Sequence, residues 1–145
     1  MLGNVWRMIV AGFIAGALSV MVFHQLGFYL AAELGFGRPN LYNMRPVPPW
    51  GVPTIVSQAF WGGLWGVLGA FVVERLPGIL KGALGWTLFG ITLVLAVNWF
   101  VVPPIKGAPM GGGWRLPGVV VVPIVYALWG YGMWLFYGLA RKLLR

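Results

Sequence analysis

The stretch MIVAGFIAGALSVMVFHQLGFYLAA, residues 8–32, runs for 25 residues without an Asp, Glu, Lys or Arg. A helix needs about 20 apolar residues to cross the hydrocarbon layer of a membrane. A cleaved secretory signal has an apolar core of only about 7–15 residues. We therefore expect this stretch to be retained as a membrane-spanning helix.

The composition of the whole chain supports the same interpretation. Of the 145 residues, 60% are hydrophobic and only 8% are charged, whereas soluble domains are about 25% charged. So little charge cannot cover the surface of a water-soluble domain of this size, which predicts an integral membrane protein. The length suits a single domain, residues 1–145.

Four segments are apolar and long enough to cross a bilayer as helices. They are residues 5–34, 54–73, 79–102 and 118–139. Helix-breaking residues separate them, such as Gly35 and Gly37 after the first and Pro103 with Pro104 after the third. The predicted fold class is all-α, a bundle of four transmembrane helices.

Two long connections, residues 35–53 and 103–117, are rich in Pro and Gly and are predicted to lie on one side of the membrane. The other side then carries both termini and six cations: Arg7, Arg75, Lys81, Arg141, Lys142 and Arg145. The loop side carries four: Arg38, Arg45, Lys106 and Arg115. Because cytoplasmic flanks of membrane helices are enriched in Lys and Arg, we expect both termini in the cytoplasm and the two loops outside.

The net charge of +8 comes from cations placed singly between apolar runs and at the C-terminus. That distribution is typical of membrane flanks and does not favour nucleic-acid binding. The chain has no Cys, one His and two acids, Glu33 and Glu74, both near predicted membrane edges. We therefore predict no catalytic residues and no metal site. Spans without a carboxylate also argue against ion-coupled transport.

Each predicted span carries hydrogen-bonding side chains in its outer half. They are His24, Gln25, Ser57, Gln58, Asn98 and Tyr126. We favour hydrogen bonds between helices, worth about 0.6–2 kcal/mol each, because none of these groups is permanently charged. The alternative is a polar binding pocket open to the outside. A third interpretation makes His24 an axial ligand of haem or bacteriochlorophyll.

Small residues recur at four-residue steps in the first two spans. They are Gly12 and Gly16 in the first, and Gly62, Gly66 and Ala70 in the second. This spacing lets helix backbones approach closely, so we expect these two helices to pack together, although either face could meet another subunit. Four tryptophans deeper in the spans are candidates for a lipid-facing or partner-facing surface: Trp61, Trp65, Trp129 and Trp134.

One resemblance covers most of the chain. The run RPVPPWGVPTIVSQAFWGGLWG, residues 45–66, together with FHQ at residues 23–25, resembles small uncharacterised bacterial inner-membrane proteins of four predicted spans. The resemblance implies a multi-pass protein of the bacterial cytoplasmic membrane. It supplies no functional residues.

These observations predict a non-catalytic membrane protein without a cofactor. We expect an accessory or scaffold subunit that associates with itself or with a larger membrane complex through glycine-lined and Trp-rich helix faces. The alternative is a small oligomeric channel or transporter whose polar site lies in the outer half of the membrane. The third possibility is a pigment or haem carrier that binds through His24.

Overall fold

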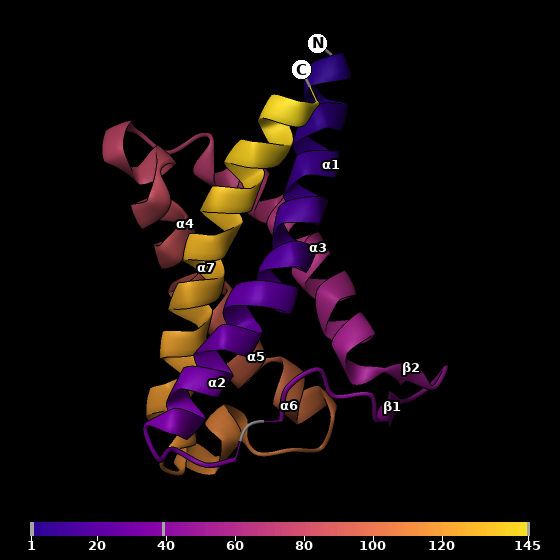
Figure 1. The fold of residues 1–145 in the computed structure, drawn as a ribbon, viewed down its shortest axis with the longest axis vertical. Helices are drawn as coiled ribbons and strands as arrows, with labels where there is room; N and C mark the ends of the chain where they lie inside the picture. The colour runs from indigo at the N-terminus through magenta and orange to yellow at the C-terminus, as the bar shows by residue number, and fades with distance from the viewer. Residues whose placement is uncertain (1, 39, 145) are drawn as a thin grey trace.

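The computed structural model describes residues 2–38 and 40–144. It confirms a mostly helical chain with four helices long and apolar enough to cross a membrane. These helices are Gly3–Glu33, Thr54–Val73, Ala83–Ile105 and Gly118–Leu143. The first helix begins and the last helix ends side by side at one end of the molecule, here called the terminal end (Figure 1). The two long connections lie at the opposite end, here called the loop end (Figure 1).

Two of the four helices contain a π-helical turn, which the sequence analysis did not predict. The first helix consists of α1 (Leu2–Ser19), the π turn η1 (Val20–His24) and α2 (Gln25–Glu33). The third consists of α4 (Ala83–Phe89), the π turn η3 (Gly90–Val94), α5 (Leu95–Phe100) and the short α6 (Val102–Ile105). Both π turns pack against α7 (Gly118–Leu143). A π turn changes the rotation of everything that follows it in the helix.

The third helix starts later and ends differently from the predicted span 79–102. The short 3₁₀ helix η2 (Gly78–Lys81) and extended Gly82 come before it, so α4 begins only at Ala83. Pro103 and Pro104 were predicted to end the third helix, but its helical backbone continues to Ile105. They lie in the first turn of α6 (Val102–Ile105), where a missing N–H costs no helix hydrogen bond.

The two connections at the loop end have some regular structure. In the first, β1 (Pro46–Val47) pairs antiparallel with β2 (Val52–Pro53) directly before α3 (Thr54–Val73). In the second, α6 is followed by the 3₁₀ turn η4 (Met110–Trp114). The Trp114 ring packs on Trp99 and Phe100, with centroid distances of 5.2 and 5.7 Å, and so ties the second loop to α5.

Helix α1 lies between α3 and α7, and α4 packs on α7 (Figure 1). The contact between α1 and α3 is made by Gly12, Gly16, Gly62 and Gly66, all buried, and is called the glycine contact below. A Cβ placed on Gly12 would lie 2.6 Å from the Gly66 carbonyl oxygen, and one on Gly16 would collide with the Gly62 carbonyl. Ala70 is also fully buried. The glycine-lined faces therefore meet each other within the chain.

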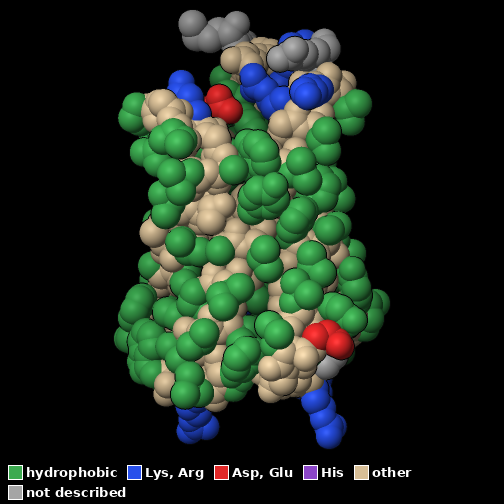
Figure 2. Space-filling model, turned by 60° about the vertical axis from the view of Figure 1, so that its left-hand side comes forward, with side chains coloured by type: hydrophobic (Ala, Val, Ile, Leu, Met, Phe, Trp, Pro, Cys, Tyr) green, Lys and Arg blue, Asp and Glu red, His purple; other side chains and the backbone are tan. Residues whose placement is uncertain are grey.

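The surface is divided along the long axis of the molecule. Hydrophobic side chains cover a broad middle belt, and Lys and Arg side chains gather at the two ends (Figure 2). Large apolar side chains such as Leu18, Leu64 and Leu93 are more than 40% exposed along this belt. A belt of this kind suits contact with lipid hydrocarbon.

Candidate functional site

The buried amide of Gln25 holds the first loop against the first helix. The Gln25 side chain is only 4% exposed, and its Oε1 accepts a hydrogen bond from the backbone N–H of Tyr42 at 3.0 Å. The Tyr42 hydroxyl in turn donates to the Met21 carbonyl oxygen at 2.8 Å. We call this arrangement of Met21, Gln25 and Tyr42 the loop latch. Its two bonds connect residues 17 and 21 positions apart in the sequence.

Local backbone geometry at both ends of the loop latch makes it possible. Met21 lies in the π turn η1. Tyr42 adopts a left-handed backbone conformation with φ of 48°, which is uncommon for a non-glycine residue. Nothing in the Pro-rich loop sequence identified Tyr42 as the partner of Gln25, because the bond uses a backbone N–H that every non-proline residue carries.

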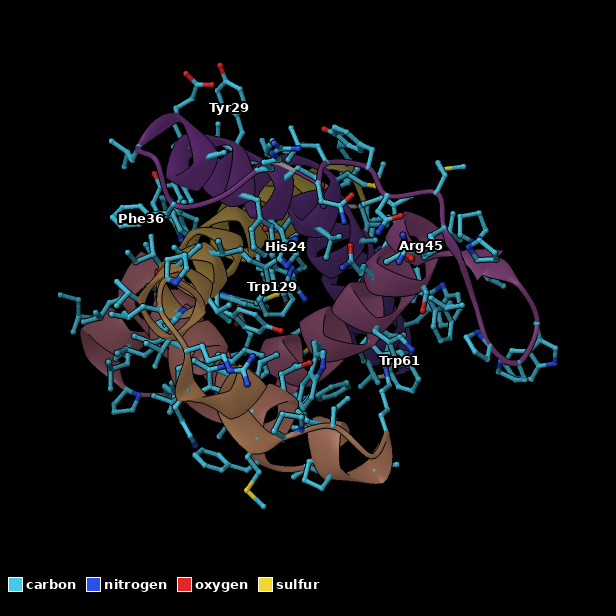
Figure 3. All side chains as sticks on the ribbon, turned by 90° about the horizontal axis from the view of Figure 1, so that it is seen from below. His24, Tyr29, Phe36, Arg45, Trp61 and Trp129 are labelled. Atoms are coloured by element: carbon cyan, nitrogen blue, oxygen red, sulfur yellow. The ribbon has the colours of Figure 1, made fainter. Side chains whose placement is uncertain are left out.

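The His24 ring lies among aromatic side chains of two helices. It packs edge-on against Phe28, at a centroid distance of 5.0 Å, and against Tyr126 of α7, at 6.2 Å. Its Nδ1 is 3.5 Å from Gln25 Nε2. Seen from the loop end, His24 and Trp129 lie between the helices, whereas Tyr29 lies at the periphery (Figure 3). The structure thus brings His24, Gln25 and Tyr126 together, and haem or pigment binding at His24 stays a prediction.

The other predicted polar residues do not join this group. Asn98 Nδ2 donates to the Val94 carbonyl oxygen of its own helix at 3.0 Å. Gln58 is exposed and Ser57 is half-buried. Within residues 2–38 and 40–144, none of the three forms a hydrogen bond with His24 or Gln25. These three residues were predicted at a similar depth in the membrane to His24 and Gln25. Their helices nevertheless do not turn them toward His24 and Gln25.

A buried polar joint between α1 and α7 was missed from the sequence. Ser19 Oγ donates to the Trp129 carbonyl oxygen at 2.6 Å, and Trp129 Nε1 donates to the Gly16 carbonyl oxygen at 3.2 Å. Ser19 and Trp129 are 0% and 3% exposed. The expectation that Trp129 faces lipid or a partner is therefore wrong, because its indole N–H needs a buried acceptor and finds one on α1. Trp61, by contrast, is 59% exposed.

A shallow pocket of about 310 Å³ adjoins the loop latch. It is lined by Val22, Gln25, Leu26, Tyr29, Leu41 and Tyr42. Most of these side chains are apolar, and the amide oxygen of Gln25 already accepts the Tyr42 N–H bond. The pocket therefore does not add support to a channel or transporter.

The comparisons with known proteins supply no relative. No family model, no curated protein and no solved structure matches the chain. Among the residues that the structure describes, no three His, Asp or Glu side chains gather closely enough to hold a metal ion. Glu33 ends α2 at the exposed surface, and Glu74 follows α3 at the terminal end.

The loop latch predicts a local effect of Tyr42→Phe. Removing the hydroxyl deletes the bond to Met21, and a net loss of about 1 kcal/mol is expected for one such bond. Backbone amides of residues 40–47 should then exchange with deuterium about fivefold faster. Hydrogen–deuterium exchange of the protein in detergent micelles measures this.

Tyr29→Phe is the matched control, because Tyr29 is exposed on α2 and donates no hydrogen bond within the described ranges. Unchanged loop exchange in Tyr42→Phe, or equal acceleration in both variants, would contradict the loop latch.

Proposed function

We propose that the protein is a multi-pass protein of the bacterial cytoplasmic membrane with the terminal end in the cytoplasm. The four apolar helices and the hydrophobic belt support membrane insertion. The orientation is supported by the excess of cations beside the termini, six against four in the sequence. The bacterial location extends the resemblance that the sequence analysis gives for residues 45–66 and 23–25, and it is part of this proposal.

Reporter fusions test this orientation. Green fluorescent protein fused after the C-terminus should fluoresce, because it folds in the cytoplasm, and alkaline phosphatase fused there should be inactive. Alkaline phosphatase inserted at Gly107, in the second loop, should be active. The reverse pattern of activities would contradict the proposed orientation.

We further propose that the protein is a non-catalytic scaffold or accessory subunit that associates with a second copy of itself. One observation carries this proposal: the exposed amide of Gln58 lies in the second turn of the apolar helix α3. It has no hydrogen-bond partner in the part of the chain that the structure describes. Lipid hydrocarbon offers no partner either, so an amide in this position favours contact with another helix.

The surroundings of Gln58 fit a helix-to-helix interface. Trp61, Leu64 and Leu68 continue the exposed surface along α3 and are 59%, 41% and 41% exposed. The glycine contact with α1 occupies a neighbouring face of α3 and begins at Gly62, one helical turn after Gln58. A glutamine amide both donates and accepts hydrogen bonds, so two copies related by a two-fold axis can pair Gln58 with Gln58. This self-complementarity favours a second copy over a different subunit.

The variant Gln58→Leu tests self-association, because leucine keeps the size of the side chain and removes the amide. The dissociation constant of the dimer should rise about 5- to 30-fold, as expected for losing about 1–2 kcal/mol of interhelical hydrogen bonding. Sedimentation equilibrium of the purified chain in mild detergent measures it.

Thr92→Val is the matched control. Thr92 is also an exposed polar residue of an apolar helix, but its hydroxyl already donates to the Leu88 carbonyl oxygen of the same helix at 2.6 Å. The Thr92→Val variant should therefore dimerise with the same dissociation constant as wild type. A monomeric wild-type protein, or equal dimerisation of wild type and Gln58→Leu, would rule out the proposed interface.

A further inference from the structure

A second pocket, of about 240 Å³, opens at the terminal end between the end of α3, the η2–α4 segment and α7. Its charged and aromatic lining includes Glu74, Lys81, Trp86, Tyr137, Arg141 and Lys142. Figure 2 shows a notch at this end of the molecule, with an acidic side chain and several Lys and Arg side chains around it. We call it the terminal pocket. None of its residues belongs to the loop latch or to the proposed Gln58 interface.

The charge of the terminal pocket favours an anion. Three cations and one carboxylate line it, which gives a net charge of +2. The cations come from two elements, Lys81 from η2 and both Arg141 and Lys142 from the last turns of α7. The C-terminal end of a helix also attracts cations and so helps to hold the two α7 side chains there.

Two buried hydrogen-bond donors in the pocket lack a full set of acceptors. The Tyr137 hydroxyl and Arg141 Nη1 are covered from solvent and lie close to each other, where the hydroxyl oxygen can accept from the guanidinium; no other partner reaches them in the described chain. Tyr137 as a whole is only 4% exposed. Leaving such groups unpaired costs free energy. Even when the Tyr137 oxygen accepts from Arg141, the hydroxyl hydrogen still lacks an acceptor, so an external partner must offer acceptor atoms.

Aromatic contacts fix both donors in place. The Tyr137 ring packs against Trp86 at a centroid distance of 5.1 Å, and the Arg141 guanidinium carbon lies 5.9 Å from the centroid of the Tyr137 ring. Trp86 itself is 1% exposed and cannot move aside without disrupting the core. The donors are thus positioned before a ligand arrives.

We propose that the terminal pocket binds the phosphate group of an acidic phospholipid from the adjoining leaflet. The phosphate oxygens would accept hydrogen bonds from Tyr137 and Arg141, and Lys81 would neutralise the charge. Basic pockets between membrane helices are suited to anionic headgroups. Trp134 of α7 also lines the pocket and is 37% exposed, so it offers an apolar surface to the acyl chains. The Glu74 carboxylate favours a headgroup with hydroxyls, such as glycerol, over a second phosphate.

The test uses the purified full chain in mild detergent, titrated with short-chain phosphatidylglycerol and followed by tryptophan fluorescence. Wild type should bind, and Lys81→Gln and Arg141→Gln should each weaken binding about tenfold through loss of a charged partner. Arg115→Gln, the same change at the loop end, should not weaken it. Tyr137→Phe should also bind more weakly, because it removes one of the donors to the phosphate.

Short-chain phosphatidylcholine and inorganic phosphate separate the possible sources of the phosphate group. Both should bind at least tenfold more weakly than phosphatidylglycerol. Inorganic phosphate binding as tightly as the lipid would overturn the proposal in favour of a soluble anion. Lys81 is exposed, so the Lys81→Gln variant should fold normally. If this variant bound phosphatidylglycerol as tightly as wild type, the proposal would also be overturned.

Discussion

The close approach of α1 and α3 at the glycine contact is the constraint on which the rest of the structure depends. Four glycines let the two backbones touch, so one side of α1 is held against α3. Its other side is then fixed against α7 by the bonds between Ser19, Trp129 and Gly16. With α1 and α7 in place, η1 comes to lie where Tyr42 can bond to Met21.

Polar groups of the core are satisfied by bonds from side chains to backbone atoms. Ser19, Gln25 and Trp129 each bond to a backbone group of another segment, and Asn98 bonds within its own helix. Apolar helices can satisfy their few polar side chains in this way, because every turn carries backbone hydrogen-bond acceptors and donors. Against this background the unsatisfied groups stand out. Gln58 at the surface and the donors of the terminal pocket are the ones that call for an external partner.

The sequence predicted the four apolar helices and the pairing of the two glycine-bearing segments, because hydropathy and four-residue spacing report directly on length and on one helix face. It grouped His24, Gln25 and Tyr126, which do lie together, with Ser57, Gln58 and Asn98, which do not join them. Counting residues from the end of a span gives the depth of a side chain in the membrane, but not the direction in which it points around the helix axis. The π turns η1 and η3 change that direction for Gln25 and Asn98, which follow them. The partner of Gln25 was hidden because it is a backbone group, and burial of Trp129 depends on α7 facing α1.

The most direct test of the central role of the glycine contact compares three Gly→Ala variants by their midpoint of thermal unfolding in detergent. Gly16→Ala and Gly66→Ala should each lower it by several degrees, because the added methyl group meets the facing carbonyl and overpacking costs about 1–3 kcal/mol. Gly138→Ala should not lower it, since a Cβ at Gly138 has no atom within 4 Å. Unfolding of all three variants at the wild-type temperature would contradict the packing of α1 against α3.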